Sequence, residues 1–262
     1  MTEKQILLDI KDLQVHYAVR TGTVKGVDHV FLPIYEGETL GLVGESACGK
    51  STLGRAILRL VSEPGEIVGG QLLFRGEDLM ARDEKEMARI RGRDISMIFQ
   101  DPMTSLNPLQ RIDSHFMETI RTHEPKTTKT EALERAQAMF DHLGIGPERL
   151  NDYPHQLSGG MRQRVMIGLA LILASDLVIA DEPTTSLDVI VEAQILDLLK
   201  ALKERLQMTL ILISHNLGIV AELADRLAVM YAGKLVEVAP ALQLFDEPLH
   251  PYTQGLLASV PN

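Results

Sequence analysis

The sequence predicts an α/β fold, and three features of its residue pattern carry that prediction. An apolar run at 39–43 precedes a glycine-containing loop, and helix-forming residues follow at 52–60, which gives the order strand, loop, helix. Residues 6–34 hold short apolar segments separated by turn signals, as antiparallel strands do. Residues 103–157 hold helical patterns and no clear strand. We therefore expect an α/β core with an N-terminal antiparallel β subdomain and an inserted α-helical subdomain.

The first part of the core is expected within residues 1–100. The segments before the glycine loop predict strands at 6–10, 13–17 and 24–34. After the loop and its helix, the pattern predicts a strand at 67–74, a helix at 83–91 and a strand at 95–99.

The inserted helical subdomain is expected at 101–157, with helices at 111–122, 130–143 and 147–150. One amphipathic face of its second helix carries Ala132, Leu133, Ala136, Met139 and Phe140. The core resumes at 158–262 and ends in a helical tail at 241–262. Its predicted elements are a helix to about 173, a strand at 177–182, a helix to about 205, a strand at 209–213 and a hairpin at 226–239.

Composition limits the classes of function. The net charge of -10 argues against a surface that coats nucleic acid. No run reaches the roughly 18 apolar residues that a membrane-spanning helix needs. Cys48 is the one cysteine, so no disulfide can form within the chain. A role in a membrane process would therefore require docking onto another subunit.

The glycine loop at 44–51 fits the phosphate-binding pattern G-x-x-x-x-G-K-[ST]. Its backbone N–H groups and the following helix N-terminus can surround phosphate oxygens. Lys50 would reach the β- and γ-phosphates, and the Ser51 hydroxyl would ligate Mg²⁺. The alternative is a glycine turn with a chance lysine, but the strand before and the helix after favour nucleotide binding.

Acidic residues follow a buried strand further along the chain. Asp181 and Glu182 end the apolar run at 177–180, where ligands of open α/β sheets gather. Asp181 fits a Mg²⁺ ligand, and Glu182 fits a base or a water-orienting group. The alternative is that these are two exposed acids at a strand end without a role in chemistry. A phosphate-binding loop in the same chain favours the functional interpretation.

Other candidate groups have weaker signals. Ser158 is a good N-cap, and Gly159 and Gly160 leave N–H groups uncovered, as at an anion-binding helix start. An ordinary capped helix is the alternative. His215 follows the predicted strand at 209–213. Tyr17 ends the second segment, and spacing alone favours a half-buried strand aromatic over a platform for adenine.

The fixed order of these motifs resembles the ATP-binding subunits of ABC transporters over essentially the whole chain. The resemblance implies that Glu182 is catalytic, that Gln100 and His215 assist it, and that Tyr17 stacks on adenine after all. It implies Mg²⁺ ligation by Ser51, Gln100 and Asp181. The implied ATP-binding residues are Tyr17, Gly44, Glu45, Ser46, Ala47, Cys48, Gly49, Lys50, Ser51, Thr52 and Gln100.

The resemblance also implies partners. Two ATPase subunits, identical or paralogous, would face each other head to tail, so that Ser158, Gly159 and Gly160 serve the partner's ATP. Two transmembrane permease subunits would hold the ATPases at the cytoplasmic face of the membrane. An extracytoplasmic solute-binding protein would act indirectly, and no nucleic acid is expected.

Four shorter features resemble the oligopeptide, dipeptide and nickel import branch. They are the run at 99–108, Met161 in place of the commoner glutamine, Met230-Tyr231-Ala232-Gly233, and His250-Pro251-Tyr252-Thr253. The expected solute is therefore a peptide or a nickel-type ion. Ser186 and Asn216 replace the usual alanine and aspartate, and we expect them to tune activity.

The cysteine-rich extension of many peptide-import members does not follow. Cys48 alone cannot build an iron–sulfur cluster, so none is expected in this chain. The chain would be a shorter member, or one that was cut. Cys48 itself lies beside Lys50 at a helix N-terminus, a position that predicts a lowered thiol pKa and inactivation by a maleimide.

Three rival functions remain in view. An ABC ATPase that acts on nucleic acid or ribosomes usually carries coiled-coil insertions, tandem cassettes or basic arms. A small-molecule P-loop kinase would leave 157–161 and His215 unexplained. A nonenzymatic scaffold would leave every filled catalytic position unexplained.

Overall fold

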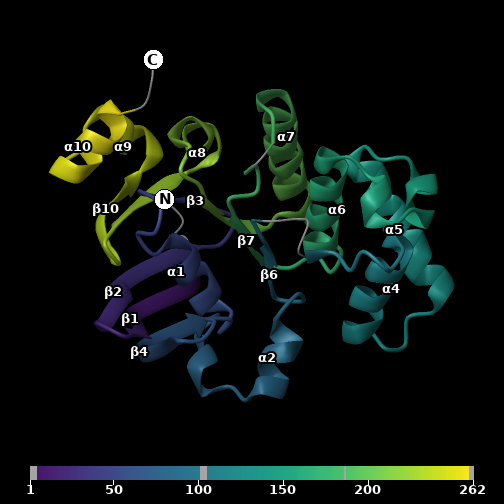
Figure 1. The fold of residues 1–262 in the computed structure, drawn as a ribbon, viewed down its shortest axis with the longest axis horizontal. Coiled ribbons are helices and arrows are strands. Elements are labelled where there is room, and N and C mark those ends of the chain that lie inside the picture. The colour runs from purple at the N-terminus through teal and green to yellow at the C-terminus, as the bar shows by residue number, and fades with distance from the viewer. Residues whose placement is uncertain (1–4, 101–104, 186, 260–262) are drawn as a thin grey trace. The chain divides into compact units, whose positions relative to one another are not determined.

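The computed structural model describes residues 5–100, 105–185 and 187–259, apart from the Ile219 side chain. The chain forms two compact units. Figure 1 labels helices and strands of both units. The first contains the residues up to 88 and those from 209 onward, and the second contains residues 89–208. The helical subdomain proposed for 101–157 stays a prediction. None of the helices in the described ranges is long and apolar enough to span a membrane.

The first unit begins with an antiparallel sheet. Its strands are β1 (Ile6–Val19), β2 (Gly22–Tyr35), β4 (Gly65–Phe74) and β5 (Glu77–Asp78), in the order β2-β1-β4-β5. Two separate strands were expected where β1 runs unbroken. The break in the apolar pattern is a bulge: Asp12 has a φ of 52°, and the register shifts between Ile10 and Leu13. The bulge keeps both halves of β1 in the same sheet.

A second set of strands in the first unit is mostly parallel. β3 (Thr39–Val43) lies between β8 (Thr209–Ile213) and β9 (Arg226–Tyr231), parallel to both. β10 (Lys234–Pro240) pairs antiparallel with β9. Every residue of β3 and β8 is buried, which explains their continuous apolar runs.

The described helices that lie wholly in the first unit are α1 (Lys50–Ile57), α8 (Leu217–Leu223), α9 (Ala241–Asp246) and α10 (Pro251–Ala258). α1 ends earlier than expected, since Arg59 takes a left-handed φ of 53°. α8 was not expected. Its Asn216 side chain accepts a hydrogen bond from the Gly218 N–H (3.1 Å), as an N-cap does. Gly41 of β3 permits close packing, because a Cβ there would lie 2.2 Å from Val220 Cγ1.

An ion pair is buried in the same unit. Glu38 has a fully buried side chain and accepts two hydrogen bonds from Arg226 Nη1, at 2.9 and 3.2 Å. The same carboxylate accepts the Tyr35 N–H at 2.8 Å. The pair therefore joins the end of β2 to the start of β9.

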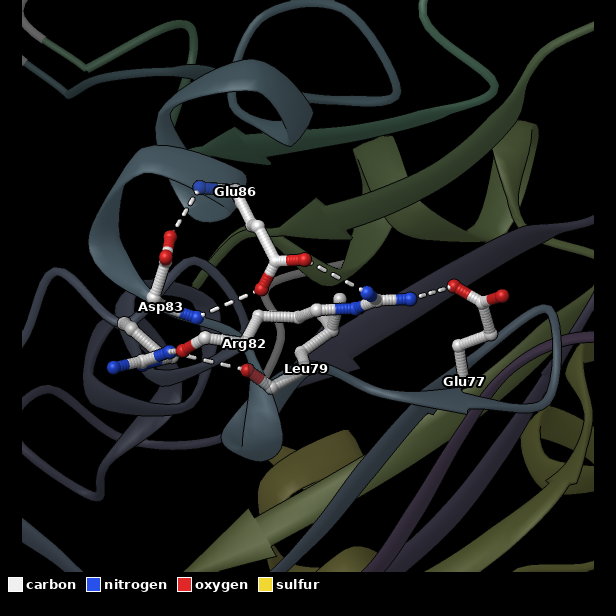
Figure 2. A network of polar contacts seen from close by, with 6 residues as sticks. Glu77, Leu79, Arg82, Asp83 and Glu86 are labelled. Carbon is white, nitrogen blue, oxygen red and sulfur yellow. Dashed lines mark hydrogen bonds and ion pairs between the residues drawn. The ribbon is translucent and has the colours of Figure 1, made fainter.

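A polar network fixes the segment after β5, which contains a 3₁₀ turn at Leu79–Ala81 and α2 (Glu84–Ile90). Figure 2 shows Arg82 between Glu77 and Glu86, with hydrogen bonds to both carboxylates. Asp83 and Glu86 cap the start of α2 reciprocally, through N–H to carboxylate bonds of 3.0 and 2.8 Å. Side chain–backbone bonding therefore defines the start of α2.

The second unit pairs β6 (Ile95–Ile98) in parallel with β7 (Leu177–Asp181). Its helices are α4 (Ile112–His123), α5 (Lys129–Leu143), α6 (Gly159–Leu171) and α7 (Val189–Leu206), with 3₁₀ turns at Pro147–Asn151 and Pro154–Gln156.

Two phenylalanine rings pack together in the core between α4 and α5. The Phe116 and Phe140 rings meet edge to face with centroids 5.6 Å apart. The predicted α5 face is confirmed, with Ala132, Ala136 and Met139 buried beside Phe140 and Leu133 half-buried.

Candidate nucleotide-binding site

The glycine loop lies between β3 and α1 in the first unit. Lys50 is 4% exposed, and its Nζ donates hydrogen bonds to Gly44 O (2.9 Å) and Glu45 O (2.8 Å). Two glycines permit the path of the loop. A Cβ on Gly44 would lie 2.2 Å from Met230 O, and one on Gly49 would lie 2.1 Å from Gly26 O. The sequence thus folds the loop tightly enough to hold its ammonium group against backbone oxygens.

Cys48 differs from the expectation. Its Sγ lies 3.8 Å from Lys50 Nζ, and the residue is 7% exposed. Burial raises the pKa of the Cys48 thiol, and the nearby Lys50 charge offsets this only in part. The prediction of a lowered pKa is therefore wrong. The sequence showed the lysine and the helix start but not the burial.

Tyr17 is half-buried near the end of β1. Its hydroxyl shares a 3.2 Å hydrogen bond with Thr52 Oγ1 on α1. The ring is closely flanked, since a Cβ on Gly26 or on Gly65 would lie 2.7 or 2.5 Å from a ring carbon. These contacts fix the Tyr17 ring beside Thr52, the residue after Ser51. Stacking of this ring on adenine stays a prediction.

His215 is exposed, directly after β8 and the buried Ser214. Its neighbour Asn216 forms the N-cap of α8. Asn216, which replaces the usual aspartate, therefore has a local structural role. His215 itself lies just beyond the end of the fully buried strand β8.

The second unit brings three polar side chains together at the end of β7. Glu182 Oε2 accepts hydrogen bonds from Gln100 Nε2 and from Thr185 Oγ1, both at 3.0 Å. Asp181, directly before it, is 1% exposed. Glu182 takes a left-handed φ of 47°, a strained conformation directly after β7. Thr185 was missed from the sequence, where a lone hydroxyl gives no distinguishing signal.

The start of α6 opens onto a cavity of about 540 Å³. Ser158, Gly159 and Gly160 line it together with Arg149, Arg164 and Asp188. The Ser158 hydroxyl accepts the Met161 N–H at 3.3 Å, which confirms the predicted N-cap. A Cβ on Gly160 would lie 2.8 Å from Val191 Cγ1, so this glycine permits close contact with α7.

The candidate residues divide between the units. The loop at 44–51, Tyr17, Thr52 and His215 belong to the first, and Gln100, Asp181, Glu182 and Ser158–Gly160 belong to the second. Ser186, and residues 101–104 of the run at 99–108, lie outside the described residues.

A lysine-bearing phosphate loop and an acid pair at a strand end define a nucleoside triphosphatase of the P-loop class. The family model described as "ABC transporter" matches residues 27–185, and the one described as "Oligopeptide/dipeptide transporter, C-terminal region" matches residues 236–262. The chain belongs to the ABC transporter family, and its activity is ATP hydrolysis. The predicted fold class and the resemblance to this family are confirmed.

Curated relatives are similar over almost the whole chain. The oligopeptide transport ATP-binding protein OppD of Bacillus subtilis is 48% identical over 258 residues, which are 97% of this chain and 72% of OppD. The dipeptide transport ATP-binding protein DppD of the same organism is 47% identical, over 97% of this chain and 77% of DppD.

Solved structures show the same fold. A dimeric post-hydrolysis state of the ATP-binding cassette MJ0796 bound to ADP and Pi superposes with a TM-score of 0.80 at 26% identity, covering 89% of this chain and 98% of that one.

Proposed function

We propose that this chain is the ATP-hydrolysing subunit of an importer for peptides. The observation that carries its hydrolytic part is the hydrogen bond of Gln100 to Glu182 beside the buried Asp181. The match of residues 236–262 and the names of the relatives support a di- or oligopeptide as the solute. Nothing among these relatives supports the alternative role on nucleic acid or ribosomes.

Residues 44–52 bind the nucleotide in this proposal. When phosphate arrives, Lys50 exchanges its bonds to Gly44 O and Glu45 O for phosphate oxygens. Tyr17 stacks on the adenine while its bond to Thr52 holds the ring in place.

Glu182 is the group that takes the proton of the attacking water. Gln100 and Thr185 both donate to its Oε2, and these two bonds orient the carboxylate before water binds. His215 contacts the γ-phosphate. The donors are set by the fold, so no reorganisation is needed at the moment of reaction.

Ser51, Asp181 and Gln100 would hold Mg²⁺. All three offer oxygen atoms, which are the ligands that Mg²⁺ prefers. A carboxylate at neutral pH only accepts hydrogen bonds, so the Gln100 amide must present its nitrogen to Glu182 and keep its oxygen Oε1 for a ligand. Bound Mg²⁺ neutralises charge on the phosphates.

A second ATPase subunit, identical or paralogous, completes each site. Ser158, Gly159 and Gly160 face the partner's ATP across the cavity that they line. Two permease subunits hold the pair at the cytoplasmic face of the membrane, and an extracytoplasmic binding protein delivers the solute.

Uptake measurements in the source organism test the proposal. The chromosomal Glu182→Gln variant should abolish uptake of labelled di- and oligopeptides and leave uptake of labelled nickel unchanged. Loss of nickel uptake with intact peptide uptake would assign the other solute, and intact uptake of both would contradict the importer role.

A further inference from the structure

The C-terminal segment contacts the phosphate loop directly. The Glu45 N–H donates a 3.0 Å hydrogen bond to Tyr252 Oη, on the first turn of α10. Glu45 directly follows Gly44, where the loop begins. One backbone N–H of the loop is therefore held by a side chain more than 200 positions away in sequence.

The position of Tyr252 is fixed from two sides. Its ring packs against the ring of Tyr231, with centroids 4.5 Å apart and planes at 45°. Before it, Glu237 on β10 accepts the N–H groups of Leu249 (2.9 Å) and His250 (3.0 Å), and His250 Nδ1 accepts the Tyr252 N–H at 3.1 Å. The hydroxyl group thus reaches the loop from an anchored helix start.

The turn between β9 and β10 contacts the same loop. The Gly233 N–H donates to Cys48 O at 2.9 Å, and Met230 O limits the space at Gly44. The two short motifs around Tyr231 and Tyr252 had no part in the hydrolysis mechanism above. Both converge on the loop, within one compact unit.

We propose that Tyr252 is a positioning residue for the phosphate loop, which links the C-terminal segment to nucleotide affinity. Its hydroxyl accepts the Glu45 N–H near the start of the loop and so keeps the following N–H groups in the arrangement that receives phosphate. A loop ordered before binding loses less conformational entropy when the ligand arrives. The inference rests on the nucleotide-binding role of residues 44–51.

The Tyr252→Phe variant tests it, because it removes the hydroxyl and keeps the ring against Tyr231. The dissociation constant of a fluorescent ATP analogue with Mg²⁺ should rise about three- to tenfold, as the loss of one hydrogen bond predicts. Amide hydrogen exchange should accelerate in residues 44–49 and stay unchanged in residues 251–258. The matched control is Tyr231→Phe, which removes a hydroxyl from the other ring of the pair and should bind as the unchanged protein does.

Unchanged affinity and unchanged exchange at 44–49 in Tyr252→Phe would overturn the inference, and so would tighter binding. Faster exchange in 251–258 together with the loop would assign Tyr252 a merely structural role and would also overturn it. Failure of the unchanged protein to bind the analogue would instead contradict the nucleotide-binding role.

Discussion

At the scale of single residues, nucleotide binding in the proposed site depends most on Lys50. It is buried and bonded to two carbonyl oxygens of its own loop, so a positive charge is kept where phosphate must bind. When nucleotide binds, the Lys50 ammonium would exchange these bonds for bonds to charged phosphate oxygens. Such charge-assisted bonds are stronger and therefore favour the bound state.

The Lys50→Ala variant should lose nucleotide binding, with a dissociation constant raised at least about a hundredfold, since charge-assisted bonds are lost. Equilibrium titration with the fluorescent ATP analogue measures it. Lys11→Ala is the control, because Lys11 is exposed and pairs with Asp9 near solvent. Tight Mg-ATP binding by the Lys50 variant would contradict the assignment of the loop.

The reactivity of Cys48 should follow its burial. Because burial raises its pKa, alkylation by iodoacetamide should be slow at neutral pH, and its rate should still rise with pH above about 8.5, the ordinary thiol value. Nucleotide should protect the thiol. A rate that levels off below that pH would show that the Lys50 charge outweighs burial.

Local patterns are enough to propose roles for some residues. The phosphate-loop pattern predicts Lys50 and Ser51 from spacing alone, because the motif and the chemistry coincide. Gln100 became a candidate only through the resemblance, since its bond to Glu182 joins positions 82 residues apart. The pKa of Cys48 depends on burial, which no local pattern states.

At the scale of elements, the Glu38–Arg226 pair joins β2 to β9 and is shielded from water on the carboxylate side. The two strands come from distant parts of the chain, so the pair ties together residues that are 188 positions apart in sequence. Loss of one partner would leave a charge buried without compensation.

The Arg226→Ala variant should therefore lose about 3–5 kcal/mol of unfolding free energy, measured by urea denaturation. The double variant Glu38→Gln, Arg226→Met should lose less, since no charge stays buried. Arg82→Ala provides the control: Glu77 and Glu86 contact it near solvent (Figure 2), and the loss should be much smaller. Equal losses for Arg226→Ala and Arg82→Ala would contradict the role of burial.

Element boundaries followed the sequence where apolar periodicity was strong, as in β3, β8 and α5. The expectation failed where one residue's backbone decided the outcome. The bulge at Asp12 joined two predicted strands into β1, and the left-handed Arg59 ended α1 early. α8 has only 7 residues and depends on packing against β3 at Gly41, which periodicity cannot reveal.

At the scale of the whole molecule, one chain holds both proposed half-sites: the loop at 44–51, and the start of α6 at Ser158–Gly160, which lines a cavity. In the proposed head-to-tail pair, each ATP needs both halves from different chains. ATP hydrolysis should then rise more steeply than linearly with protein concentration, and binding should not. A strictly proportional hydrolysis rate would contradict the paired site.

The steady-state rate of phosphate release by Glu182→Gln at saturating Mg-ATP tests the central claim most directly. The amide cannot accept the proton of the attacking water, so turnover should fall about 10²- to 10⁴-fold while ATP stays bound and the chain stays paired. Turnover equal to that of the unchanged protein would remove Glu182 as the catalytic group and contradict the proposed mechanism.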